Sequence, residues 1–216
     1  MFLKRQMKKK TIFSRLVKKI KIVGLSNFLM SLLKRIFFLS LRLRYKFNVW
    51  HASSPLESTP YKSQVIDLVN SFSPSTVVEI GCGLGEMLTK IKSQYRIGID
   101  YDFGAIQAAT FLNKKNIEFI HHDFESIKNI DLNVSKIDFL LMINWTHEMK
   151  WEVLKKNLSQ FNSCFRTKYL LIDIIKEGNE GYPFFHTKEN LSKLGKIIKV
   201  VPARDHVREI CLLELN

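Results

Sequence analysis

Three glycines at alternate positions follow a short apolar stretch and form the strongest candidate for a ligand site. The run is Glu79-Ile80-Gly81-Cys82-Gly83-Leu84-Gly85. Glycine has no Cβ, so the backbone can turn tightly there or approach a ligand closely. A strand over residues 76–80, this turn and a helix-like run over residues 86–91 would form the opening unit of a nucleotide-binding α/β sheet.

The spacing of the glycines narrows the kind of ligand. A dinucleotide-binding fingerprint, G-x-G-x-x-G, needs its third glycine at position 86, which is Glu86 in this chain. A phosphate-binding loop needs Gly-Lys followed by Ser or Thr, and no such triplet follows. The spacing therefore excludes both of these sites.

Further acids occur where later strands are predicted to end. Residues 95–100 and 117–123 read as strands that finish at Asp100 and Asp123. Residues 137–144 are almost wholly apolar until Asn144, which is typical of a strand buried on both faces. The strand ends lie 21 to 23 residues apart, which fits one strand and one crossover helix per unit.

The E-x-G-x-G-x-G run, with acids at these intervals, resembles motif I of the class I S-adenosylmethionine (SAM)-dependent methyltransferases. The resemblance implies an α/β fold with a seven-stranded, mostly parallel Rossmann-like sheet and helices on both faces. The SAM-binding domain would span residues 50–216. Residues 169–175 would add the fifth strand, and residues 197–201 and 210–215 a closing hairpin with the one antiparallel strand.

The resemblance also implies SAM as the cofactor and assigns residues to it. Glu79 would hold the methionine part, the glycine backbone would pack against it, and Asp100 would accept both ribose hydroxyls. Tyr101 would lie along the adenine and Asp123 would accept from its exocyclic amine. The implied cofactor-binding residues are Glu79, Gly81, Cys82, Gly83, Gly85, Asp100, Tyr101, Asp123, Phe124 and Asn144.

The loop after the fourth strand is where this family often places acceptor-side residues. His147 is the first titratable group in that loop, and a histidine suits a general base for a hydroxyl acceptor. His186 is the rival base. The alternative is that His147 caps a helix or lies on the surface. Three widely spaced cysteines without C-x-x-C predict a reducing cytoplasm and no metal site.

Departures from related subfamilies narrow the acceptor. Asn144 is followed by Trp145-Thr146 and not by the Pro-Pro-aromatic run of exocyclic-amine nucleic-acid methylases. The Pro-Cys nucleophile of cytosine C5 methylases and the paired glutamates of arginine methylases are missing as well. We therefore expect O-methylation of a sugar, lipid-linked glycan or metabolite hydroxyl. The alternatives are an RNA methyltransferase and a non-catalytic SAM-fold module that binds a partner.

The basic residues are concentrated in an N-terminal arm, residues 1–49. The net charge is +14, and residues 1–50 hold 14 Lys or Arg and no acid. Apolar residues at helical spacing predict amphipathic helices over 12–23 and from a cap at Ser26 or Asn27. A polar loop over 51–60 and a helix over 61–72 would follow.

A basic amphipathic arm favours an anionic partner. We expect a cytoplasmic protein whose arm lies on the cytoplasmic face of the membrane. Bulky aliphatic residues outnumber aromatic ones, which makes nucleic acid the less favoured partner. Plain docking of the arm on the domain is the remaining alternative.

Overall fold

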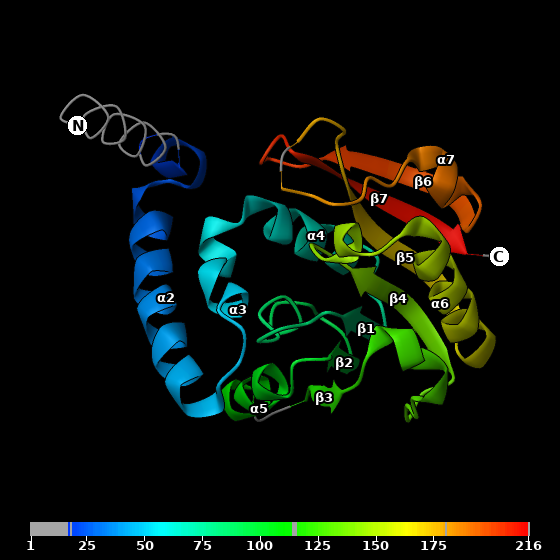
Figure 1. The fold of residues 1–216 in the computed structure, drawn as a ribbon, viewed down its shortest axis with the longest axis horizontal. Coiled ribbons are helices and arrows are strands. Elements are labelled where there is room, and N and C mark those ends of the chain that lie inside the picture. Colours follow the sequence, from blue (N-terminus) through cyan, green and yellow to red (C-terminus); the bar gives the residue numbers. More distant parts are fainter. Residues whose placement is uncertain (1–16, 18, 114–115, 180, 216) are drawn as a thin grey trace.

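The computed structural model describes residues 17, 19–113, 116–179 and 181–215. Among these, seven strands form one sheet in the order β3-β2-β1-β4-β5-β7-β6, flanked by helices (Figure 1). The strands are β1 (Thr76–Ile80), β2 (Tyr95–Asp100), β3 (Glu118–His121), β4 (Lys136–Met142), β5 (Arg166–Ile175), β6 (Gly195–Pro202) and β7 (Arg208–Leu215). The α-helices are α2 (Leu25–Tyr45), α3 (Trp50–Ser53), α4 (Pro60–Asn70), α5 (Phe103–Leu112), α6 (Trp151–Cys164) and α7 (Lys188–Ser192). Short 3-10 helices are η1 (Leu56–Ser58), η2 (Phe124–Asn129) and η3 (Thr146–Glu148).

The strand directions confirm the predicted fold class. β1 pairs in parallel with β2 and β4, and the parallel pairing continues from β2 to β3 and from β4 to β5. β7 is antiparallel to both of its neighbours, β5 and β6. The closing hairpin therefore contains the one antiparallel strand expected within the sheet.

The two faces of the sheet build two separate cores. Side chains alternate between faces along a strand, so Val77 and Val78 of β1 enter different cores. One core packs against η2 and α6, and the other packs against α4. Phe139, Leu140 and Leu141 of β4 are all fully buried, as the uninterrupted apolar run predicts.

The run over residues 86–91 does not form the helix that the sequence predicts. It forms hydrogen-bonded turns between β1 and β2. The side chain of Asn70, at the end of α4, donates to the carbonyl of Lys90 and accepts from the N–H of Lys92. These two hydrogen bonds pair backbone groups at the end of the segment. The ends of a short helix would have left such groups unpaired.

Residues 51–60 are more regular than the predicted loop, because α3 and η1 lie there. Ala52 of α3 is fully buried, so this short helix is held by packing. The hydroxyl of Thr59 donates to the carbonyl of Pro55 and closes the turn around η1. The Pro and Ser residues of this stretch predict a loop, and tertiary packing overrides that local signal.

α2 begins at Leu25 after Gly24, whose φ is 83°, and carries no side-chain cap. The predicted cap at Ser26 or Asn27 is therefore wrong, and the Asn27 amide instead donates to the carbonyl of Val23. Of the predicted arm helix over 12–23, residues 17 and 19–23 are helical, and the remainder lies outside the described residues.

α2 lies beside the domain and contacts it along one side (Figure 1). Phe38 and Leu41 are buried in a third core with Ala105 and Ala108 of α5. The domain boundary at residues 49 and 50 stays a prediction, since this core includes residues from both sides of it. None of the described helices is long and apolar enough to cross a membrane.

Candidate active site

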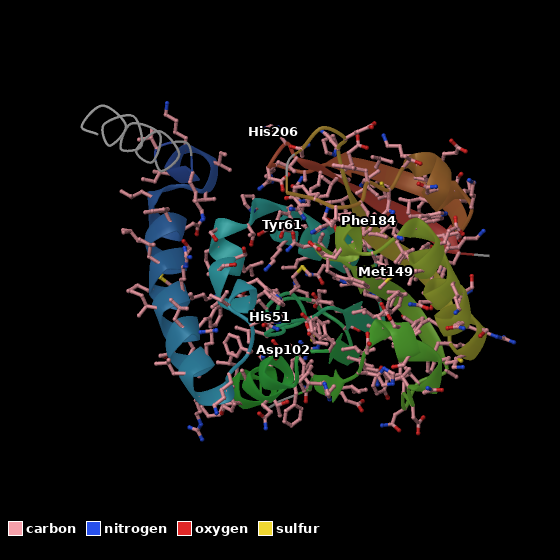
Figure 2. The ribbon with its side chains drawn as sticks, in the orientation of Figure 1. His51, Tyr61, Asp102, Met149, Phe184 and His206 are labelled. Atoms are coloured by element: carbon pink, nitrogen blue, oxygen red, sulfur yellow. The ribbon has the colours of Figure 1, made fainter. Side chains whose placement is uncertain are left out.

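A cavity of about 730 Å³ opens at the carboxyl ends of β1, β2 and β4. In an open parallel sheet this is the edge where ligands bind. Figure 2 shows His51 of α3 and Met149, after η3, on different sides of this region, and both residues line the cavity. The cavity therefore brings together the glycine loop, the residues before β1 and the loop after β4.

The three glycines of the loop after β1 adopt backbone conformations that favour glycine. Gly81, Gly83 and Gly85 have φ angles of 76°, 53° and 72°. A Cβ on these residues would meet the rings of Trp145, His51 and Phe119 respectively. The indole N–H of Trp145 also donates to the carbonyl of Ile80, at 2.6 Å. The glycines thus serve the chain's own packing, and their contact with a cofactor stays a prediction.

Asp100, the last residue of β2, is buried and held in one orientation. One carboxylate oxygen accepts from the N–H of Gly83 at 2.8 Å, and the other accepts from the N–H of Asp102 at 2.9 Å. Each oxygen can accept a further hydrogen bond. Asp100 therefore fixes the glycine loop and still offers acceptors to a ligand in the cavity.

Glu79 places a buried carboxyl group on the cavity wall, and one of its oxygens is unpaired within the described part of the chain. It lies on the cavity wall with only 3% of its surface exposed, and its Oε2 has no hydrogen-bond partner within the described residues. Burial raises the pKa of Glu79 to about 8, with Lys62 opposing the rise and Asp100 adding to it. Buried polar atoms are normally paired. The ammonium group of the methionine part of SAM would fit this carboxylate.

Lys62, in the first turn of α4, supplies a buried amine to the same wall. Its Nζ donates to the carbonyl of Ser54 at 2.9 Å. Burial lowers the pKa of Lys62, and Glu86 and Glu79 oppose the shift. Sequence reasoning missed this residue. A usable signal existed, because a helix leading into β1 must begin near the carboxyl edge of the sheet.

Ten of the twelve predicted site residues line the cavity. They are Glu79, Gly81, Cys82, Gly83, Asp100, Tyr101, Asp123, Phe124, Asn144 and His147. Gly85 and His186 do not line it. Tyr101 and Asp123 are exposed at its edge, and one Asp123 oxygen accepts from the N–H of Glu125 at the start of η2. The binding roles of these residues stay predictions.

His147, in η3, presents an imidazole to the acceptor side of the cavity. Its side chain is largely buried, its ring meets the Tyr182 ring edge-on, and its Nε2 lies 3.3 Å from a carboxylate oxygen of Glu148. Burial lowers the pKa of His147, and Asp173 and Glu148 offset this only in part. The ring is therefore neutral at pH 7 and able to accept a proton.

His186 lies behind the same loop. Its Nε2 donates to the carbonyl oxygen of Thr146 at 2.9 Å, and the ring is buried beside Trp151. Its Nδ1 has no partner within the described residues. His186 therefore contacts η3 and does not line the cavity, and its role as the rival base stays a prediction.

A buried arginine on β7 holds the loop after β4. Arg208 donates from Nη1 to Asp173 of β5 at 2.6 Å and to the side chain of Asn144 at 2.8 Å. It also donates to Asp205 and lies over the ring of Tyr61. Burial alone would lower the pKa of Arg208, but Asp173, Tyr61 and Asp205 hold it above the usual value. Asn144, with φ of 71°, is thereby fixed to β5 and β7.

Residues 77–168 match the family model described as "Methyltransferase domain". Over these residues the chain is similar to methyltransferases. The match runs from β1 to the start of β5, a segment that contains the predicted cofactor residues. The match and the fold favour an enzyme that uses SAM as its cofactor.

Several solved methyltransferase structures share this fold. The N-methyltransferase NodS from Bradyrhizobium japonicum WM9, in complex with S-adenosyl-L-homocysteine, is 14% identical with a TM-score of 0.61, covering 73% of this chain and 88% of that one. Magnesium protoporphyrin IX methyltransferase (ChlM) from Synechocystis PCC 6803, with bound SAM, is 14% identical with a TM-score of 0.55, covering 72% and 80%. The small RNA methyltransferase HEN1 is 18% identical with a TM-score of 0.56, covering 72% and 25%. At these identities the likeness is one of fold.

Proposed function

We propose that this methyltransferase transfers a methyl group to a hydroxyl of a small acceptor, such as a sugar, a lipid-linked glycan or a metabolite. The observation that carries the proposal is the imidazole of His147 on the cavity wall, where burial lowers its pKa. SAM, when bound, supplies the electrophilic methyl group. Methyl transfer to a hydroxyl gains from removal of the hydroxyl proton, and a neutral histidine suits that step.

The residues of the cavity divide this work. Glu79 and Asp100 hold the cofactor by its ammonium and ribose groups, which aligns the methyl group for displacement. His147 accepts the acceptor's hydroxyl proton at a ring nitrogen. The carboxylate of Glu148, 3.3 Å from Nε2, stabilises the positive charge that the ring gains.

The experiment is a transfer assay with methyl-labelled SAM and chemically defined acceptors that carry hydroxyl or amine groups, with RNA as a third class. We expect label on a hydroxyl. With that acceptor, His147→Ala should lower kcat by about 10²-fold or more and leave SAM affinity nearly unchanged. The parent rate should rise with pH through a pKa below 6.5 and then level, because the basic form of His147 is the active one.

His186→Ala is the matched control, since it changes a histidine behind the same loop. His186→Ala should keep the acidic pH limb. If His186→Ala loses that limb while His147→Ala keeps it, His186 is the base. Equal turnover of parent and His147→Ala would reject His147. Label on an amine or on RNA would replace the proposed acceptor class.

We also propose that the enzyme works in the cytoplasm, at the cytoplasmic face of the membrane, with the basic arm as its contact. The support is the concentration of 14 basic residues and no acid in residues 1–50. This location would suit an acceptor carried by a lipid.

A further inference from the structure

The outer side of α2 is an apolar surface that the described part of the chain leaves uncovered. Leu33, Ile36 and Leu43 are 64%, 67% and 81% exposed. The exposed apolar residues of this helix, which we call the α2 outer face, are Leu25, Leu29, Met30, Leu32, Leu33, Ile36, Phe37, Leu39 and Leu43. Contiguous apolar patches of this kind on a folded protein mark interaction sites.

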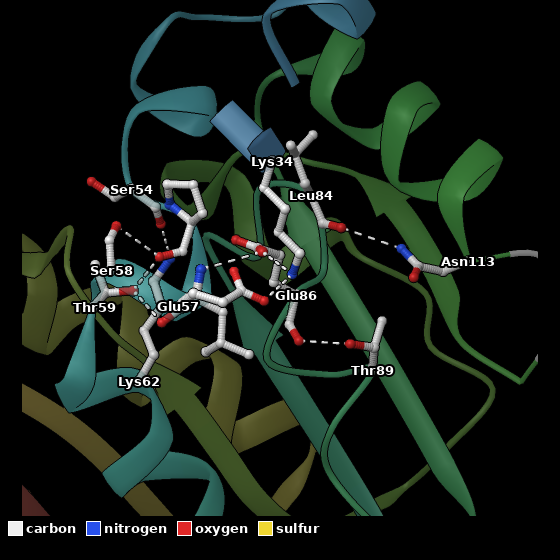
Figure 3. Close-up of polar contacts among 12 residues, drawn as sticks. Lys34, Ser54, Glu57, Ser58, Thr59, Lys62, Leu84, Glu86, Thr89 and Asn113 are labelled. Atoms are coloured by element: carbon white, nitrogen blue, oxygen red, sulfur yellow. Dashed lines mark hydrogen bonds and ion pairs between the residues drawn. The ribbon is translucent and has the colours of Figure 1, made fainter. Parts of the chain in front are cut away.

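The opposite side of α2 is fixed to the domain, so the helix cannot turn its outer face inward. Phe38 and Leu41 are buried in the core that α2 shares with α5. Lys34 forms ion pairs with Glu57 next to α4 and with Glu86 on the cavity wall (Figure 3). These ion pairs raise the pKa of Lys34 against the effect of its partial burial. Any partner that covers the α2 outer face must therefore lie outside this domain.

The charges beside the outer face are all positive. At 100° per residue, Arg35 lies on one flank of the apolar stripe, and Arg44 lies within the stripe near its C-terminal end. Burial lowers the pKa of Lys19, and the nearby Arg35 adds to this shift. A wide apolar face on a helix whose charged residues are all cations is complementary to an anionic lipid surface, where the side chains enter the boundary of the acyl chains.

A second copy of the chain is the rival occupant. Leu25, Leu29, Leu32, Ile36, Leu39 and Leu43 follow the alternating spacing of four and three residues of a coiled-coil seam. Such a seam is normally flanked by charges of both signs, however, and α2 contains no acidic residue. Met30, Leu33 and Phe37 also make the face wider than a two-helix seam needs.

We propose that the α2 outer face binds the surface of an anionic phospholipid bilayer, with α2 lying along the membrane. The helix has 21 residues, about 32 Å of length. Trp50 on the cavity wall is the seventh residue after Leu43, a chain distance of at most about 25 Å. The inference rests on the proposed membrane location, but not on the proposed chemistry.

The test is sedimentation of the full chain with vesicles of phosphatidylcholine alone or mixed with phosphatidylglycerol. The parent should bind the anionic vesicles, and added salt should weaken binding. The combined variant Leu33→Ser, Ile36→Ser and Leu43→Ser should lose at least tenfold in binding. Val153→Ser with Ile198→Ser, two exposed apolar residues on α6 and β6, is the matched control and should bind like the parent.

Binding of S-adenosylhomocysteine by each variant would show that the domain is still folded. A triple variant that binds anionic vesicles as well as the parent would overturn the α2 inference and leave the rest of the arm as the anchor. A parent that binds no vesicle would overturn the membrane location too, without touching the methyl-transfer assay. A parent that is dimeric by light scattering, and a triple variant that is monomeric, with no vesicle binding, would assign the face to a second copy.

Discussion

The two sides of the cavity are held in place by different means. On the cofactor side, Asp100 binds the backbone N–H groups of Gly83 and Asp102, which are near neighbours at the ends of β1 and β2. On the acceptor side, Asn144 is fixed by side chains of Asp173 and Arg208, which lie 29 and 64 residues further along the chain.

This difference determines how each side should respond to mutation. A loop held by its own glycine conformations and the carboxylate of Asp100 keeps its shape when a ligand contact other than Asp100 is removed. A loop held by a buried ion pair does not, because loss of one partner leaves the other buried and uncompensated. Substitutions on the cofactor side should therefore change binding, and those in the acceptor-side network should change stability and the position of η3.

The largest effect should come from Arg208→Met. This variant leaves Asp173 without its cation in a buried site, and we expect a loss of about 3–5 kcal/mol in the free energy of unfolding. Urea denaturation measures this loss. Arg204→Met, an exposed residue in the preceding turn, is the control and should unfold like the parent. A loss for Arg208→Met as small as that of the control would show that the network does not hold the acceptor loop.

A smaller effect should appear at Glu79, as the number of protons released when the ligand binds. The pKa of about 8 leaves Glu79 mostly protonated at pH 7 in the free enzyme, and a bound ammonium group favours the carboxylate. Ligand binding at pH 7 should therefore release up to about one proton, and affinity should rise with pH until the pKa is passed. Calorimetry of S-adenosylhomocysteine in buffers of different ionisation enthalpy measures the release.

Glu79→Gln provides the comparison for that measurement. It keeps the shape of the side chain and removes the titration, so its proton release should be smaller than that of the parent. The same release in both proteins would mean that Glu79 does not receive the ammonium group.

The cofactor side was largely predictable because its signals are local. Glycines at alternate positions, with acids at strand ends 21 to 23 residues apart, predicted the strands and the residues on the cavity wall. The turns over 86–91 were not predictable from that segment alone, since they are hydrogen-bonded to the side chain of Asn70 in α4.

The acceptor side was predictable only in part. His147 was found from its place after the fourth strand, but nothing near Asn144 in the sequence indicates that Arg208 reaches it. The sequence also indicates the apolar positions of α2, but it does not indicate which side of the helix packs against the domain. Phe38 and Leu41 are buried and Leu33 and Ile36 exposed, and Lys34 meets two acids of the domain on the docked side of the helix.

The most direct test of the account is calorimetric titration of SAM and S-adenosylhomocysteine into the folded parent and into Asp100→Ala. The parent should bind both ligands with micromolar affinity. Asp100→Ala should remain folded and weaken binding by roughly 1.5–3 kcal/mol, the scale for hydrogen bonds to a charged group. Absence of binding heat with either ligand, on folded parent protein, would contradict the assignment of the cavity to SAM. Equal affinity in parent and variant would show that Asp100 does not bind the ribose.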